Sequence, residues 1–262
     1  MVVGILYICT GKYNQFFSLF YESMQKNFLP NCEKKYFVWS DQDDLTHGLS
    51  NVFFTHKECG GFPADSLFRF DIFLQAEDKL KNCDYLYYIN ANANIIKEIG
   101  SEILPDASQL VAVEWPVKYR LLSSSVFYHY ERNPKSLAYV KPFDGPYKYY
   151  MGGLNGGTAE AYLTMIHELS ENIKVDYSNG IIACSNDESH LNRYLHDNLC
   201  KVLPYGYCWP EEWNSPSNTK ILFRNKIKLD SYFNKGRNIG AWGRIERLWY
   251  LTTRALRWYV KL

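Results

Sequence analysis

Residues 85–95 read YLYYINANANI, and this stretch decides the fold that the sequence predicts. Its first half, residues 85–89, has the aromatic and β-branched composition of a buried strand. Three asparagines follow within residues 90–94, and asparagine favours turns, so the simplest interpretation is that the strand ends there. In parallel sheets, however, ligands bind beyond the carboxyl ends of the strands. The asparagines therefore mark a candidate ligand-binding edge as well as a turn.

Helical and extended patterns alternate on the N-terminal side of this strand. Apolar residues recur every fourth position, the spacing of one helical face, at Phe16, Phe20, Met24 and Phe28. Pro30 ends that helix. The expected elements are, in chain order, a strand at 2–10, a helix at 14–30, strands at 34–41 and 51–56, and a helix at 63–84. This alternation predicts an α/β fold with a mostly parallel central sheet flanked by helices.

The C-terminal side of the strand is less regular. We expect strands at 109–115, 201–204 and 220–226, and helices through 162–173 and at 186–198. Residues 151–157, MGGLNGG, contain too many glycines for a plain strand and indicate close approach of the backbone to another group. The Tyr-rich residues 120–150 receive no assignment.

The C-terminal 22 residues, AWGRIERLWYLTTRALRWYVKL, predict an amphipathic helix. Four apolar residues share one face, namely Ile245, Trp249, Leu256 and Tyr259. Basic residues recur every seventh position on another face, at Arg247, Arg254 and Lys261. Such a helix either lies on a membrane surface or packs across its own domain, and the pattern leaves both open. We divide the chain into a domain at 1–228 and a basic, aromatic tail with this helix at 229–262.

Composition excludes several classes of protein. A net charge of +1 over 262 residues gives no basic field for nucleic acid. The seven cysteines show no C-x-x-C spacing, which favours reduced thiols and a cytoplasmic location. No apolar run reaches the roughly 20 residues that span a bilayer, so we expect a soluble protein, with peripheral contact to the inner membrane as a further hypothesis.

Individually, the candidate functional residues carry little information. Asp187 and Glu188 begin a helix, where acidic residues are common because they complement the helix dipole. His190 and His196 are six residues apart, which does not match a zinc pair, so we expect no metal site. No P-loop or dinucleotide-binding glycine motif is present.

Three blocks taken together are more specific. They are YERNPKSLAY (130–139), YYMGGLNGG (149–157) and DESHLNRYL (187–195). With LFRFDIF, YLYYINAN and KILFRNK in this order, the chain resembles glycosyltransferase family 6, which contains the histo-blood-group A and B transferases and the α-1,3-galactosyltransferases. The resemblance covers residues 2–228. It implies a GT-A type nucleotide-sugar-binding fold and retaining transfer of Gal or GalNAc from a UDP-sugar to a galactose 3-hydroxyl.

The resemblance also assigns roles to individual residues. Glu188 matches the essential carboxylate beside the anomeric carbon. The residues that match donor-binding positions are Ile8, Cys9, Thr10, Tyr13, Arg69, Asn90, Asn92, Met151, Gly152, Gly153, Asp187, Arg224 and Lys226. The acceptor-binding candidates are Trp115, where mammalian relatives carry His, Ser185, where the blood-group enzymes carry Trp, and Trp209.

Asn90-Ala91-Asn92 falls where mammalian members have the Asp-x-Asp motif that holds Mn²⁺. Neutral amides are poor replacements for carboxylates around a hard divalent cation, so we predict activity without a metal. Side-chain cations must then stabilise the departing UDP. The candidates are Lys226, Arg224 and Lys12, with Lys235 and Arg237 in a tail that closes over the site.

Gly153 aligns with the position at which the blood-group enzymes carry Gly for GalNAc and Ala for Gal, because the smaller residue leaves space for an N-acetyl group. We therefore expect UDP-GalNAc as donor, although Met151 is the residue type of the Gal enzyme. The expected acceptor is galactose carrying α-1,2-linked fucose. UDP-Gal as donor, or a non-catalytic sugar- or nucleotide-binding protein, remain alternatives. Retention through a covalent intermediate on Glu188 and a front-face reaction are both compatible with the sequence.

Overall fold

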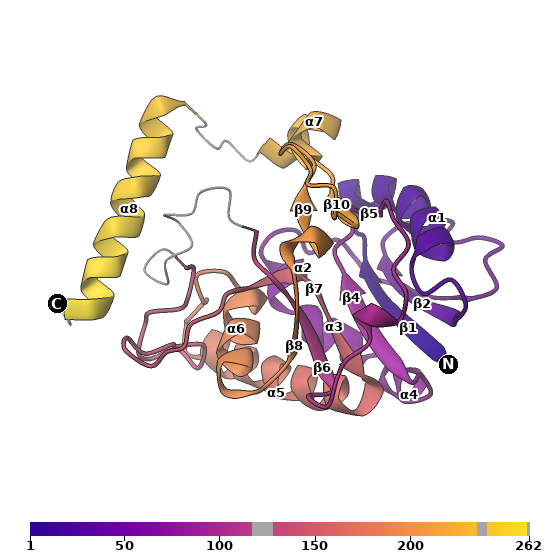
Figure 1. Ribbon diagram of the computed structural model, residues 1–262, viewed down its shortest axis with the longest axis horizontal. Coiled ribbons are helices and arrows are strands. Elements are labelled where there is room, and N and C mark those ends of the chain that lie inside the picture. Colours follow the sequence, from indigo (N-terminus) through magenta and orange to yellow (C-terminus); the bar gives the residue numbers. More distant parts are fainter. Residues whose placement is uncertain (117–127, 235–239, 261–262) are drawn as a thin grey trace.

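The computed structural model describes residues 1–116, 128–234 and 240–260, and its centre is a seven-stranded sheet in the order β3-β2-β1-β4-β7-β6-β8 (Figure 1). The strands are β1 (Val2–Ile8), β2 (Glu33–Ser40), β3 (Val52–His56), β4 (Tyr85–Ile89), β6 (Leu110–Glu114), β7 (Tyr150–Thr158) and β8 (Lys201–Leu203). All pair in parallel except β7, which is antiparallel to β4 and β6. The prediction of a mostly parallel α/β sheet flanked by helices is confirmed.

The stretch YLYYINANANI behaves as the sequence indicates. Residues 85–89 form β4, a core strand whose last four residues are buried. The chain turns at Asn90, and β5 (Ala93–Ile95) then joins a second small sheet with β9 (Trp209–Pro210) and β10 (Ile221–Phe223). This small sheet lies at the carboxyl end of β4, so the asparagine turn connects the two sheets (Figure 1).

The prediction that residues 151–157 contain too many glycines for a plain strand is wrong. They are part of β7, within the central sheet. A Cβ on Gly156 would lie 2.4 Å from a ring carbon of Tyr87, and one on Gly157 would lie 2.5 Å from the Gln109 carbonyl oxygen. The expected close approach of the backbone is therefore real, and neighbouring strands cause it. Because β7 is antiparallel, its first residues lie at the edge where β1 and β4 end.

The helices fill both faces of the sheet. The first predicted helix is a 3-10 turn, η1 (Gly11–Phe16), followed by α1 (Phe17–Asn27). The helix at 162–173 lies within α5 (Ala159–Ser178), and the helix predicted at 186–198 is α6 (Asp187–Asp197). Two apolar cores result, one containing α1 and the other containing α5 and α6.

The single helix predicted at 63–84 is wrong. The segment forms three short helices, α2 (Ala64–Leu67), α3 (Arg69–Leu74) and α4 (Glu77–Leu80). The chain leaves helical geometry at Phe68 (φ −95°, ψ 19°) and again at Ala76 (φ −107°, ψ 13°). The first break allows Leu67 and Phe70 to enter the core while Arg69 is also buried. Tertiary packing overrides the helical period here.

The remaining short elements connect the sheets and complete the domain. They are η2 (Ser101–Ile103), η5 (Tyr205–Tyr207), α7 (Lys226–Leu229) and η6 (Ser231–Asn234). Lys235 and Arg237, which we predicted to close over the site, lie outside the described residues.

The predicted C-terminal helix is α8 (Ala241–Val260), and it lies apart from the central sheet at one side of the molecule (Figure 1). Its C-terminal part packs on the Tyr-rich segment, where Trp258 is 4% exposed and its Nε1 donates to the Val140 carbonyl at 2.8 Å. Packing on its own domain therefore accounts for one face of α8. No described helix is both long enough and apolar enough to cross a membrane.

Candidate active site

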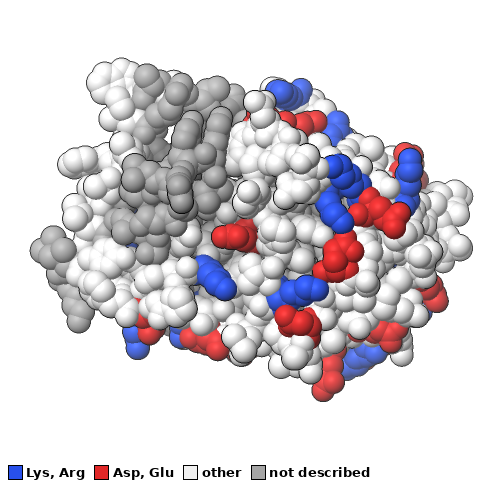
Figure 2. Space-filling view, in the orientation of Figure 1, with Lys and Arg blue, Asp and Glu red and all other residues white. Residues whose placement is uncertain are grey.

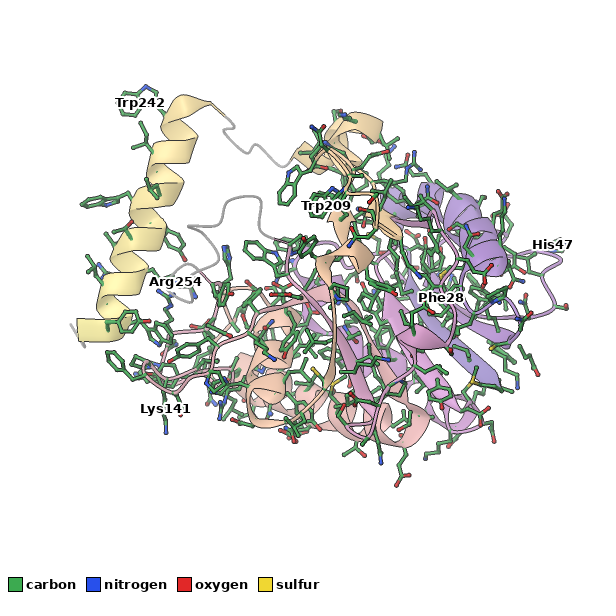
Figure 3. The ribbon with its side chains drawn as sticks, viewed as in Figure 1. Phe28, His47, Lys141, Trp209, Trp242 and Arg254 are labelled. Atoms are coloured by element: carbon green, nitrogen blue, oxygen red, sulfur yellow. The ribbon has the colours of Figure 1, made fainter. Side chains whose placement is uncertain are left out.

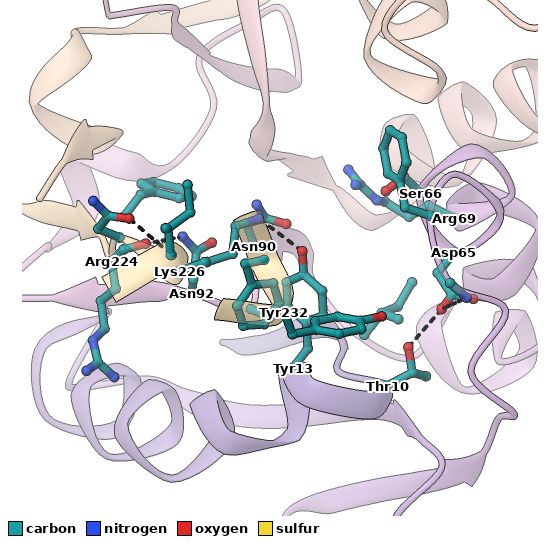
Figure 4. Close-up of a pocket in the computed structure, with 18 of the residues that line it drawn as sticks. Thr10, Tyr13, Asp65, Ser66, Arg69, Asn90, Asn92, Arg224, Lys226 and Tyr232 are labelled. Atoms are coloured by element: carbon teal, nitrogen blue, oxygen red, sulfur yellow. Dashed lines mark hydrogen bonds between the residues drawn. The ribbon is translucent and has the colours of Figure 1, made fainter. Parts of the chain in front are cut away.

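A cleft of about 420 Å³ opens at the edge where β1 and β4 end (Figure 4). Its walls come from the β1–η1 connection, the segment before α3, the asparagine turn after β4, and the chain around β10 and α7. In Figure 4, Lys226 and Arg224 lie at one end, Arg69 and Asp65 lie at the other, and Asn90 lies between them. One carboxylate is engaged within the wall, since Asp65 accepts from Thr10 Oγ1 at 2.8 Å.

Glu188 is held beside this cleft by both of its carboxylate oxygens. Oε1 accepts from the Tyr149 hydroxyl at 2.6 Å, and Oε2 accepts from the Gly152 amide at 2.7 Å. The backbone is fixed as well, because Asn192 Nδ2 donates to both the Glu188 carbonyl (2.9 Å) and the Tyr150 carbonyl (2.8 Å), which ties α6 to β7. Burial raises the pKa of Glu188, and the donors from Tyr149 and Gly152 oppose that rise. Glu188 is thus an oriented carboxylate.

Arg69 and Asp187 form a buried ion pair next to Glu188. Nη1 of Arg69 lies 2.8 Å from Oδ2 of Asp187, and the two side chains are 10% and 5% exposed. Nη1 also donates to the Gly152 carbonyl at 3.1 Å, and the guanidinium stacks on the Tyr88 ring at 4.2 Å. Removing one partner of such a pair costs about 3–5 kcal/mol because the other charge stays buried. The pair therefore fixes α3, α6 and β7 at the site.

The asparagine turn carries amides whose hydrogen bonds are partly used. Asn90 Oδ1 accepts from the Tyr88 hydroxyl at 2.7 Å, so the capacity it keeps for a ligand is mainly the two N–H groups of Nδ2. Asn92 Nδ2 donates to the Arg224 carbonyl at 2.8 Å, while its buried Oδ1 has no hydrogen-bond partner among the described residues. Asn92 thus fixes the chain that leads from β10 to Lys226.

The side chains of the asparagine turn are poor ligands for a divalent cation. Mn²⁺ and Mg²⁺ prefer carboxylate oxygens, and the turn offers two neutral amides with one free buried oxygen between them. The nearby Asp187 carboxylate is paired with Arg69. Within residues 1–116, 128–234 and 240–260, no group of three His, Cys, Asp or Glu side chains is placed to hold a metal ion.

Cations line the cleft on the side opposite Arg69. Lys226 Nζ donates to the Tyr13 hydroxyl at 3.0 Å, and the Arg224 guanidinium lies 5.9 Å from the centre of the Phe16 ring. Lys12, the third cation candidate, pairs with Asp230 at 3.4 Å and does not line the cleft. The geometry therefore favours Lys226 and Arg224 as the groups that face an anionic ligand.

The structure brings most of the predicted site residues together. The cleft is lined by Ile8, Thr10, Tyr13, Arg69, Asn90, Asn92, Arg224 and Lys226. Next to it lie Asp187, Glu188 and the Met151-Gly152-Gly153 segment, since the Asn90 amide donates to the Gly153 carbonyl at 2.8 Å. Cys9 differs, because its side chain is fully buried in the core. Burial also raises the pKa of its thiol, which keeps it neutral.

The three acceptor candidates are more scattered. The Trp115 ring lies edge-on to Tyr149, with 5.8 Å between ring centres, and Ser185 lies in the turn that leads into α6. Trp209 lies in β9, next to Pro210 of the cleft wall, and its ring packs against Trp213 at 5.5 Å.

Tyr149 is a candidate site residue that the sequence does not predict, because a tyrosine before a glycine-rich strand gives no local signal of a hydrogen bond to a distant helix. Replacing Tyr149 by Phe removes a donor to a charged acceptor, which is worth about 1.5–3 kcal/mol. We expect kcat to fall by about 10- to 100-fold. The acid limb of the pH–rate profile should move to higher pH, because the pKa of Glu188 rises further when this donor is lost. An unshifted profile measured from pH 4 to 8 would contradict the contact.

His190, two residues after Glu188, makes the fold sensitive to acid. Its side chain is 2% exposed, and burial lowers its pKa to about 4 from 6.5. A lowered pKa stabilises the fold above pH 6.5, and this contribution is lost as the pH falls through 6.5 towards 4. We expect a loss of about 3 kcal/mol in the free energy of unfolding over that interval. Denaturant titrations at several pH values should show a flatter dependence for His190→Leu.

Comparison with known proteins agrees with this arrangement. The sequence profile of glycosyltransferase family 6 matches residues 1–232. The O-antigen biosynthesis glycosyltransferase WbnI of Escherichia coli is 34% identical over 238 residues, covering 89% of this chain and 99% of that protein. The histo-blood group ABO system transferase 2 of Rattus norvegicus is 30% identical, over 80% of this chain and 64% of the rat protein. The Homo sapiens globoside alpha-1,3-N-acetylgalactosaminyltransferase 1 is 27% identical, over 88% of this chain and 67% of the human protein.

Proposed function

The chain belongs to glycosyltransferase family 6, and from this premise we propose that it transfers GalNAc from UDP-GalNAc to the 3-hydroxyl of a galactose that carries α-1,2-linked fucose. The transfer retains the α configuration and uses no divalent ion. Glycosyltransferase activity follows from the family, whereas the donor, the acceptor and the absence of a metal are our proposal.

The observation that carries the proposal is the way Glu188 is held. A carboxylate fixed through both oxygens by Tyr149 and Gly152, beside a cleft with cations at both ends, supports a role for Glu188 at one face of an anomeric carbon. The same backbone segment that fixes Glu188 continues into Gly153, whose carbonyl accepts from Asn90. The donor sugar is thereby expected between the asparagine turn and Glu188.

Charge at the other end of the cleft supports activity without a metal. When the bond between sugar and UDP breaks, negative charge develops on the diphosphate, and fixed donors aimed at that position lower the barrier. Lys226 and Arg224 supply positive charge there, and the N–H groups of Asn90 supply neutral donors. An aspartate at position 90 would instead repel the phosphate oxygens unless a cation lay between them.

Donor choice depends on the space at Gly153. A Cβ there would lie 2.8 Å from Met151 Cε and 3.1 Å from Phe223 Cε1, so alanine has to displace Met151 or narrow the sugar site. We expect Gly153→Ala to lower kcat/KM for UDP-GalNAc relative to UDP-Gal by about 10-fold or more, which corresponds to 1–3 kcal/mol for one misplaced methyl group. The ratio of the two donors in competition measures the effect. An unchanged ratio would remove Gly153 from donor selection.

The relatives' names support this choice of donor and linkage. The human relative is named for α-1,3-N-acetylgalactosaminyl transfer, while the name of the E. coli relative specifies neither sugar nor linkage. UDP-Gal is therefore the principal alternative donor. A second alternative is a protein that only binds sugar or nucleotide. The presence of Asn90 and Asn92 in place of the metal-binding aspartates favours this alternative, and the fixed carboxylate of Glu188 argues against it.

The reaction can follow either of two routes, and Glu188 acts in both. In a double displacement, Glu188 attacks the anomeric carbon as UDP leaves, and the acceptor hydroxyl then displaces the carboxylate. In a front-face reaction, Glu188 stabilises the positive charge of the sugar while the acceptor attacks from the side that UDP leaves. Arg69 and Asp187 orient the donor sugar and hold the wall behind it.

A donor and acceptor panel tests the proposal. UDP-GalNAc and UDP-Gal are each incubated with Fuc-α1,2-Gal, with unsubstituted galactosides and with no acceptor, and the product linkage is determined by NMR. The proposal expects an α-1,3-linked GalNAc product on the fucosylated acceptor. Preferential transfer from UDP-Gal would establish the alternative donor. Binding of both ligands without turnover would establish a binding protein.

A further inference from the structure

The exposed stripe of α8 presents an apolar surface that the glycosyltransferase domain does not cover. Its members are Trp242, Ile245, Trp249 and Leu256, which are 74%, 57%, 71% and 56% exposed. Spacings of three, four and seven residues place all four side chains on one face of a helix. We infer that this stripe binds the surface of an anionic lipid bilayer, with α8 lying in the plane of the headgroups.

The opposite face of α8 explains how the stripe is held outward. Arg254 Nη2 donates to the Tyr130 carbonyl and Trp258 is buried against Val140. At the end of the helix the Tyr259 ring, which lies beside the stripe, packs against Phe143 with 5.0 Å between centres. Figure 3 shows Arg254 directed towards the body of the protein and Trp242 at the far end of the helix, directed away from it. One face therefore docks the helix and leaves the stripe free.

Composition identifies a bilayer as the surface that covers this stripe. Tryptophan is enriched at the boundary between headgroups and acyl chains, and the stripe contains two. Besides the docked Arg254, the helix sequence contains three arginines (Arg244, Arg247 and Arg257) and one acidic residue, Glu246. This excess of positive charge complements the negative surface of anionic lipids. Figure 2 shows mostly uncharged side chains over the described part of α8.

A second copy of the helix fits the same stripe less well. Helix pairs gain specificity from opposite charges that flank the apolar seam. The positions beside this seam include Leu248, Thr252 and Thr253; one flank carries Glu246 and Arg257, and the other carries no charge. The net positive charge of each helix also opposes pairing. The family profile ends at residue 232, so α8 lies outside the part that the family shares.

The docked face of α8 is linked to Glu188 through a series of aromatic contacts. The ring of Trp258 lies 6.4 Å from Tyr130, Tyr130 lies 5.4 Å from Tyr149, and the Tyr149 hydroxyl donates to Glu188. The inference rests on the stripe and its charge and does not depend on which sugar is transferred.

Vesicle co-sedimentation of the whole chain tests the inference. The probes are vesicles of phosphatidylglycerol and phosphatidylethanolamine, compared with vesicles of phosphatidylcholine alone. We expect the protein to partition onto the anionic vesicles, and we expect Trp242→Ser/Trp249→Ser to reduce that partitioning at least tenfold. Leu199→Ser is the matched control, since Leu199 is 85% exposed and lies outside α8. It should partition as the unsubstituted protein does.

Two further readouts keep the outcomes distinct. Brominated lipids should quench tryptophan fluorescence of the unsubstituted protein and leave that of the double variant unaffected. Sedimentation velocity reports whether the chain self-associates. Absence of the protein from the anionic pellet, equal partitioning of the double variant, or a dimer that the double variant abolishes without any lipid binding would each overturn the inference.

Discussion

Replacing Glu188 by Gln is expected to lower kcat for sugar transfer on the order of 10³-fold while UDP binding stays close to that of the unsubstituted protein. In the proposed reaction the carboxylate acts on the anomeric carbon in the transition state, so its charge matters little when the donor is bound in its ground state. A neutral amide can neither attack this carbon nor stabilise its positive charge. The loss therefore appears in kcat.

The site can accommodate the Gln side chain without losing its fold. The amide oxygen can accept from the Gly152 amide, as Oε2 of Glu188 does at 2.7 Å. The amide NH₂ can donate to the Tyr149 oxygen, because a hydroxyl group both donates and accepts. The thermal midpoint of the variant and its affinity for UDP, measured by calorimetry, should therefore remain near the original values. Transfer by Glu188→Gln at an undiminished rate would show that another group is the catalytic carboxylate.

Replacing Lys226 by Ala is the second change with a large expected effect. Lys226 lines the cleft and contacts Tyr13 at 3.0 Å, so it can reach a diphosphate bound between η1 and the asparagine turn. If transfer proceeds without a divalent ion, as we propose, this side chain should carry a large share of the charge stabilisation for the departing UDP. Loss of one such preorganised donor costs about 10²- to 10³-fold in kcat.

Lys228→Ala is the matched control for Lys226→Ala. Lys228 lies on the same short helix, α7, but it is exposed and does not line the cleft. Its removal changes the net charge equally, so it reports any general electrostatic effect. We expect kcat to be preserved. Equal losses in the two variants would indicate that overall charge, and not the placement of Lys226, governs the rate.

Much of the fold could be predicted from the sequence because local signals and tertiary structure agree over most of the chain. The buried strand at 85–89 can be recognised from its own aromatic and β-branched residues. The helix that contains α1 can likewise be recognised from the four-residue spacing of its apolar residues, Phe16 to Phe28. The interruption of 63–84 could not be predicted, because its cause is the burial of Arg69 against distant β7 and α6. Strand β7 could not be predicted either, because its glycines are needed only where atoms of neighbouring strands leave no space for a Cβ.

The part of the site that follows the carboxyl ends of strands could be predicted, because ligands bind at this edge of a parallel sheet. Asn90, Thr10 and Tyr13 follow β4 and β1, and the topology places them together. Partners across the chain were not predictable from local pattern. Tyr149 reaches Glu188 only because α6 packs on β7 through Asn192, and Asn92 holds Arg224 only because β5 and β10 are neighbours.

Turnover of UDP-GalNAc after complete removal of metal tests the central claim most directly. The protein is dialysed against EDTA, residual metal is quantified by mass spectrometry, and transfer is then measured with chelator or with added Mn²⁺. We expect the same rate in both conditions, because the amide donors of the turn and the cations Lys226 and Arg224 would stabilise the departing diphosphate without a metal ion. A rate that vanishes with chelator and returns with Mn²⁺ would contradict the account.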